Sequence, residues 1–85
     1  MLKIGDVLNH KNEKEPKKRY WMGKVPKVDN FGQKINRAFI DGKTNNGPWA
    51  IMTPLSFVAY GLGLGMGLGQ RYECQVDGRW LKVEG

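Results

Sequence analysis

The chain has 85 residues, and its 14 Lys and Arg against eight Asp and Glu give a formal charge of +6. A chain this short forms one domain with a small hydrophobic core. Cys74 and His10 are its only cysteine and histidine, which excludes an intrachain disulfide and a structural zinc site built from four Cys or His ligands. We therefore expect a single domain over residues 1–85, in a reducing compartment, stabilised by apolar packing or self-association and holding no cofactor.

The sequence carries no sign of an export or membrane segment. Residues 1–6 lack the apolar region of a secretory signal. The long uncharged stretch of residues 44–70 contains two prolines and many glycines, which disfavours a membrane span. We expect a cytoplasmic protein with no membrane partner.

The positive charge is concentrated in the N-terminal third. Residues 1–28 carry eight Lys or Arg against three acids, whereas residues 29–85 carry six against five. Residues 9–19 are polar throughout and bury too little surface to offset the entropy of ordering, so they are predicted to form a mobile basic loop. The basic charge indicates an attraction to polyanions.

The centre of the chain is typical of short strands separated by turns. A strand or knuckle is predicted over residues 20–26, and a turn over residues 29–32. Residues 35–42 form a strand candidate, which the final Asp-Gly pair would close as a turn. Residues 49–52 form another short strand, while residues 55–60 are apolar throughout and too short to distinguish helix from strand.

Residues 61–69 alternate glycine with a large aliphatic residue. In an extended chain the three leucines and Met66 would share one face, opposite bare backbone. We expect an ordered Gly-rich loop whose apolar face is buried and whose glycine face allows another backbone to approach. The run lacks the spacing of a dinucleotide-binding fingerprint, and Gln70 stands where a phosphate loop needs Lys.

The C-terminal part is predicted to be a β-hairpin. Residues 71–76 and 79–83 flank Asp77-Gly78, a pair that favours a type I′ turn. The predicted fold class is therefore a small β-rich single domain built from antiparallel hairpins.

The residue pattern does not predict catalysis. Most acidic residues fall in turns, basic loops or hairpin arms, where they have ordinary local roles. The imidazole of His10 lies in the predicted mobile loop, where it would not be held beside a nucleophile. We expect a protein that is not an enzyme.

Cations and aromatic rings lie close together before residue 28. Such a combination suits single-stranded nucleic acid, because the cations follow the phosphates and the rings stack on bases. The candidate nucleic-acid-binding residues are Lys17, Lys18, Arg19, Tyr20, Lys24 and Lys27. Large aromatic residues in a small domain also serve the core, so a buried role for Tyr20 and Trp21 is the alternative.

A family resemblance is carried by three strings together: FIDGKT at 39–44, GPWAIM at 47–52 and YGLGLGMGLGQRY at 60–72. They resemble the small uncharacterised zinc-ribbon proteins of bacteriophages and plasmids, over residues 19–83. The cysteine pairs of that family correspond to Arg19 and Met22, and to Thr53 and Ser56, with Phe57 where a histidine often follows. All four ligand positions are changed, so the resemblance implies a zinc-ribbon-like path for the chain and no metal.

The loss of zinc requires a replacement, because the metal contributes about 10 kcal/mol to the folding of small ribbons. Trp21, Met22 and Phe57 bring apolar mass to the two knuckles. We expect these knuckles to meet as an apolar cluster, supported by Trp49 and the aliphatic residues of 62–68, so that truncating Met22 would destabilise the fold.

These observations favour a non-enzymatic binding protein of phage or mobile-element type, which contacts nucleic acid or a nucleic-acid-handling host complex. Two alternatives stay open. One is a protein–protein interaction module, or an inhibitor of a host factor, that uses the Leu/Gly surface. The other is a structural homodimer that pairs through the edge of its hairpin.

Overall fold

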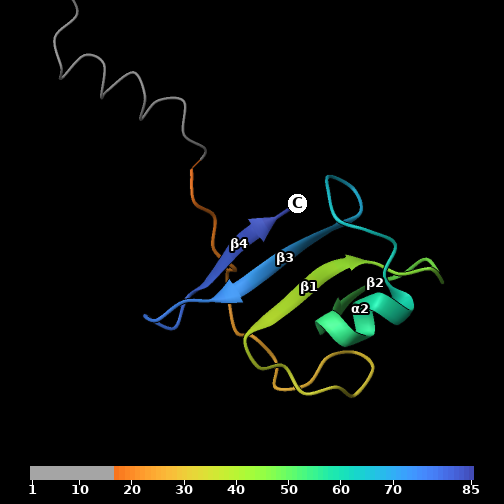
Figure 1. The fold of residues 1–85 in the computed structure, drawn as a ribbon, viewed down its shortest axis with the longest axis horizontal. Coiled ribbons are helices and arrows are strands. Elements are labelled where there is room, and N and C mark those ends of the chain that lie inside the picture. Colours follow the sequence, from red (N-terminus) through yellow and green to blue (C-terminus); the bar gives the residue numbers. More distant parts are fainter. Residues whose placement is uncertain (1–16) are drawn as a thin grey trace, which may run out of the picture.

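The computed structural model of the protein describes residues 17–85. Over this range it is a four-stranded antiparallel sheet, in the order β2-β1-β3-β4, with one short helix against β1 and β2 (Figure 1). The elements are β1 (Ala38–Lys43), β2 (Trp49–Met52), α2 (Pro54–Tyr60), β3 (Gly69–Cys74) and β4 (Trp80–Glu84). The predicted small β-rich fold is confirmed. The predicted mobile loop falls largely outside the described residues, and its last three residues, 17–19, are exposed and lie outside any strand or helix.

Helix α2 settles the ambiguity of residues 55–60. The hydroxyl of Thr53 accepts a hydrogen bond from the backbone N–H of Ser56 at 3.2 Å, which caps the helix. Pro54 follows in the first turn, where its missing N–H costs nothing. The helix ends at Tyr60, and the N–H of the next residue, Gly61, donates to the carbonyl of Phe57. A cap followed by proline therefore selects a helix for this apolar run.

Gly42 lies inside β1, so the predicted Asp-Gly turn is wrong. It pairs with Ala50 of β2 and with Gly69 of β3. A Cβ at Gly42 would lie 2.9 Å from the carbonyl oxygen of Leu68 and 3.0 Å from the Cα of Gly69. The glycine therefore serves the close approach of two strands, a constraint that comes from a distant segment and has no local signal.

Replacing Gly42 with alanine is expected to lower the free energy of unfolding by about 2 kcal/mol, because the added methyl group would push against the backbone of β3. The matched control is Gly63→Ala, since a Cβ at Gly63 would meet only the flexible end of Leu68 at 3.7 Å. Urea denaturation of both variants measures the difference. Equal stabilities would contradict the close-approach role.

The Gly-rich run does not present its aliphatic side chains as one buried face. Lys43 donates its N–H to the carbonyl of Leu68 at 2.7 Å, and the run reverses direction between Gly65 and Leu68. Gly65 and Gly67 have φ angles of 126° and 77°, which glycine tolerates best. Met66 is 96% exposed and Leu62 is 52% exposed. The prediction of a single extended, buried face is wrong, because positive φ angles turn the chain.

The predicted C-terminal hairpin is confirmed as β3 and β4, but its turn is of a different type. Gly78 has a φ of 88°, whereas no non-glycine residue of the described range has a positive φ. A type I′ turn needs two positive φ angles. Instead, the N–H of Gly78 donates to the carbonyl of Gln75 at 2.9 Å, and the N–H of Gln75 donates to the carbonyl of Arg79 at 2.7 Å. This pattern fits a type I turn followed by a glycine bulge, which the same Asp-Gly pair also suits.

An aromatic cluster forms the main core on one face of the sheet. Phe39 is fully buried and lies 5.2 Å, between ring centroids, from each of Trp21, Tyr72 and Trp80. Trp21 meets the rings of Phe39 and Tyr72 edge-on, an arrangement that aromatic quadrupoles favour. The buried core also contains Ile40. Trp21 therefore belongs to the core, which was the alternative to a role in nucleic-acid binding.

The two knuckles of the expected zinc-ribbon path do not meet. Arg19 pairs through its carbonyl with β4, whereas Thr53 follows β2 at the opposite edge of the sheet. Met22 is 86% exposed, so it contributes to no apolar cluster. The prediction that Met22 and Phe57 replace the metal together is wrong, because Trp21 turns inward onto the sheet and its neighbour turns outward.

Residues that precede β1 form hydrogen bonds with both edge strands of the sheet, β4 and β2. At β4, Lys82 donates its N–H to Arg19 at 2.8 Å, and Trp21 donates to Trp80 at 2.9 Å. At β2, Asn30 donates its N–H to Ile51 at 3.0 Å and accepts the N–H of Ile51 on Oδ1 at 2.7 Å. Such cover protects edge strands from pairing with other chains. A homodimer through the β4 edge would find these backbone groups already bonded.

Candidate nucleic-acid interface

The first four candidate residues lie along the outer side of β4. Tyr20 forms a β-bridge with Leu81, and the backbone of Arg19 is bonded to Lys82. This short pairing fixes the backbone from Arg19 to Trp21, and residues 17–19 are all exposed. Because side chains alternate along an extended chain, Arg19 lies on the same side as Lys82, whereas Tyr20 lies on the other side with Arg79. We call the surface formed by residues 17–20 with Arg79 and Lys82 the β4 edge.

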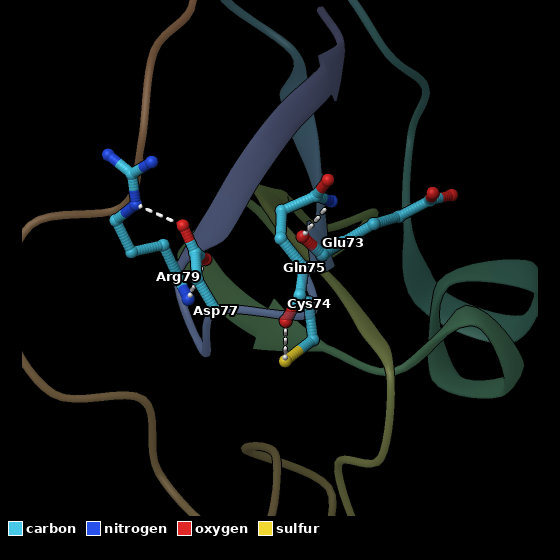
Figure 2. A network of polar contacts seen from close by, with 5 residues as sticks. All are labelled: Glu73, Cys74, Gln75, Asp77 and Arg79. Carbon is cyan, nitrogen blue, oxygen red and sulfur yellow. Dashed lines mark hydrogen bonds and ion pairs between the residues drawn. The ribbon is translucent and has the colours of Figure 1, made fainter.

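Arg79 and Tyr20 form the centre of the β4 edge. The guanidinium carbon of Arg79 lies 4.1 Å from the centre of the Tyr20 ring, a cation–π contact. Asp77 holds Arg79 from the other side, since its carboxylate accepts from the Arg79 Nε at 2.9 Å and from the Arg79 backbone at 3.0 Å (Figure 2). These hydrogen bonds hold the pKa of Asp77 below its usual range, and the Asp77 carboxylate raises the pKa of Arg79. One face of the Tyr20 ring is thus covered by a cation.

The polar groups of the hairpin end are bonded within the hairpin itself. Gln75 donates from Nε2 to the carbonyl of Glu73 at 3.0 Å, and the thiol of Cys74 points to the carbonyl of Gln75 at 3.6 Å (Figure 2). Cys74 is a free, half-buried cysteine. These contacts shape the turn that positions Arg79.

Lys24 and Lys27 lie beyond a change of direction at Gly23, which has a φ of 91°. Both are exposed, and the carbonyl of Lys27 accepts from the N–H of Ile35 at 2.9 Å. They therefore belong to the segment that leads away from the β4 edge, whereas residues 17–20 are brought together with β4.

Arg79 and Lys82 were missed as interface residues from the sequence. The sequence did indicate that they could contribute, because both are cations of the predicted hairpin. Their proximity to Tyr20 depends on a pairing between opposite ends of the chain, which no local pattern indicates.

A buried carboxylate occupies the region where the second pair of zinc ligands was expected. Asp29 accepts hydrogen bonds from the backbone N–H groups of Phe31 at 2.8 Å, Gln33 at 2.9 Å and Thr53 at 2.8 Å. Burial raises the pKa of Asp29, but hydrogen bonds from the Ser56 hydroxyl and the three amides outweigh it and hold the pKa well below its usual range. We call this cluster the Asp29 hub.

The hub joins separate parts of the chain through hydrogen bonds. The hydroxyls of Thr53 and Ser56 are 3.2 Å apart and both residues are buried. Over residues 17–85, no group of three or more His, Cys, Asp or Glu side chains is placed to hold a metal ion.

Helix α2 has seven residues, and the described part of the chain contains no helix with the length and apolar character needed to cross a bilayer. The chain matches no protein-family model, and no curated protein or solved structure matches it significantly.

Proposed function

We propose that the protein is a non-enzymatic binding protein that contacts single-stranded nucleic acid through the β4 edge. The supporting observation is that residues 17–19 are exposed cations, and that a backbone pairing holds Arg19 beside Lys82 and Tyr20 beside Arg79. Cations spaced along an extended strand can follow successive phosphates. The Tyr20 ring would stack on a base through the face that Arg79 does not cover.

The finer parts of the family resemblance belong to the same proposal. A zinc-ribbon-like protein of phage or mobile-element type, with an ordered Gly-rich loop and no metal, would be of the right size and charge for a nucleic-acid-handling complex in the host cytoplasm. The Asp29 hub is consistent with this view, because it ties Thr53 and Ser56 to a distant loop through hydrogen bonds.

Binding is expected to weaken steeply with salt, because each neutralised phosphate releases counterions. In Lys17→Gln/Lys18→Gln, the slope of log K against log salt should fall by about 0.7 for each lost phosphate contact. Fluorescence anisotropy of a labelled single-stranded oligonucleotide measures the slope. Lys43→Gln is the control, since Lys43 is exposed at the far end of β1. Absence of binding at low salt would contradict the proposal.

A second candidate, a protein–protein interaction module, is favoured by one observation. The segment of residues 55–68 exposes several large apolar side chains: Leu55 at 68%, Val58 at 84%, Leu62 at 52% and Met66 at 96%. Large apolar side chains that are exposed on one segment are typical of interaction surfaces when they form a patch. An inhibitor of a host factor would use this segment instead of the β4 edge.

A further inference from the structure

A second cationic surface lies away from the β4 edge, where the loop before β1 meets the start of α2. It is a hollow of about 400 Å3, which we call the Arg37 hollow. Its lining residues are Gln33, Lys34, Asn36, Arg37, Ala38, Thr53, Pro54, Leu55 and Arg71. The lining thus contains three cations and no carboxylate.

The cations of the Arg37 hollow are carried by a fixed backbone. The carbonyl of Arg37 accepts from the N–H of Cys74 at 2.8 Å, and Lys34 forms a β-bridge with Val28. The side chain of Arg71 is 28% exposed and comes from the middle of β3. The backbone that carries these cations is therefore already ordered before a ligand binds, which lowers the entropy lost on binding.

The carboxylates beside the hollow are already bonded. Glu73 meets only the Nε of Arg71, at 3.2 Å, which leaves the terminal nitrogens of that guanidinium for a ligand. Asp29 accepts from the backbones of Gln33 and Thr53, which both line the hollow. The three cations of the lining outnumber these two neighbouring carboxylates, which leaves a positive charge that favours a phosphate.

The remaining lining groups suit the rest of a nucleotide. Ala38, Pro54 and Leu55 give an apolar wall, and the amides of Gln33 and Asn36 offer both donors and acceptors. A volume of about 400 Å3 lies at the lower end of small-molecule sites. We propose that the Arg37 hollow binds the phosphate of a single nucleotide, with its base against the apolar wall. This site uses other residues than the β4 edge and does not depend on it.

A titration of the 85-residue protein with deoxyadenosine 5′-monophosphate, followed by NMR, tests the proposal. We expect saturating shifts of the backbone amides of Arg37 and Ala38 at millimolar ligand. Arg37→Gln should weaken this binding about tenfold, because a charge-assisted hydrogen bond is lost. Lys43→Gln should leave it unchanged, and the nucleoside without phosphate should bind about tenfold more weakly than the mononucleotide.

The source of the nucleotide is distinguished by a second titration with a single-stranded oligonucleotide. Shifts of the same amides at lower concentration would assign the hollow to one nucleotide of a strand, whereas shifts with the mononucleotide alone would assign it to a free ligand. Lys17→Gln/Lys18→Gln should not alter the mononucleotide titration, which separates this site from the β4 edge. No saturating shift at the hollow, or equal weakening by Arg37→Gln and Lys43→Gln, would overturn the proposal.

Discussion

Replacing Asp29 with alanine is expected to lower the free energy of unfolding by about 3 kcal/mol. Asp29 is only 5% exposed, and its carboxylate accepts from three backbone N–H groups. Alanine would leave these buried donors without partners, and each such donor costs about 1–3 kcal/mol. Because a domain of this size has a small margin of stability, this variant should be among the most damaging single changes.

Urea denaturation at neutral pH measures the effect of Asp29→Ala. Asp77→Ala is the matched control, because Asp77 also accepts two hydrogen bonds but lies in an exposed turn. We expect no measurable change in its unfolding midpoint. Similar losses in both variants would show that the hub is no more important than a surface turn.

The pH dependence of stability provides a second measure of the Asp29 hub. The pKa of Asp29 is lower in the folded protein than its unfolded value of about 3.9. Its contribution is therefore fully present above that value and is lost as the pH falls toward the folded pKa. Burial raises the pKa of Asp41, so protonation of Asp41 opposes this loss. Asp29→Asn should reduce the acid-induced destabilisation between about pH 5 and pH 2.5.

Trp21→Ala is expected to lower the free energy of unfolding by about 3 kcal/mol, because the indole packs against two rings of the aromatic cluster. The adjacent change, Met22→Ala, should alter stability by less than about 0.5 kcal/mol, since Met22 is 86% exposed. Thermal and urea unfolding of the two variants compare neighbouring residues of similar apolar character. A larger loss in Met22→Ala would refute the described packing.

A third variant separates apolar packing from hydrogen bonding at Trp21. The buried Nε1 of Trp21 has no hydrogen-bond partner in the described part of the chain. Trp21→Phe therefore removes ring volume without removing a hydrogen bond, and it should cost less than half of the Trp21→Ala loss. Circular dichroism in the aromatic region would show whether the cluster keeps its arrangement.

The elements that were predictable from the sequence are those with local causes. The hairpin over β3 and β4 follows from the alternation of its arms and from the Asp77-Gly78 pair. The cause of α2 is also local, since Thr53-Pro54 caps it, although the apolar run alone did not distinguish helix from strand. Local patterns indicate such elements because the interactions that form them span only a few residues.

The elements that were not predictable depend on segments far apart in the chain. The Asp-Gly pair predicts a turn at Gly42, whereas this glycine lets β3 approach β1. The apolar character of Met22 predicts a core residue, whereas only its neighbour Trp21 packs inward. The Asp29 hub was missed because an aspartate before Asn and Gly reads as an ordinary turn former.

At the candidate interface, the sequence indicates several exposed cations, but not which of them lie together. Arg79 and Lys82 join residues 17–20 only through the pairing of Tyr20 with Leu81. The type of residue was thus predictable, and the arrangement of the surface was not.

The pairing of Tyr20 with Leu81 has a consequence for how the protein folds. The two residues are about sixty positions apart, so closing this contact requires a large loop-closure entropy and raises the contact order. The central hairpins can form from nearby residues, whereas the aromatic cluster is complete only when Trp21 docks over Phe39. The docking of residues 17–21 is therefore expected to be a late step in folding, and the cations of the β4 edge would come together only in the finished domain.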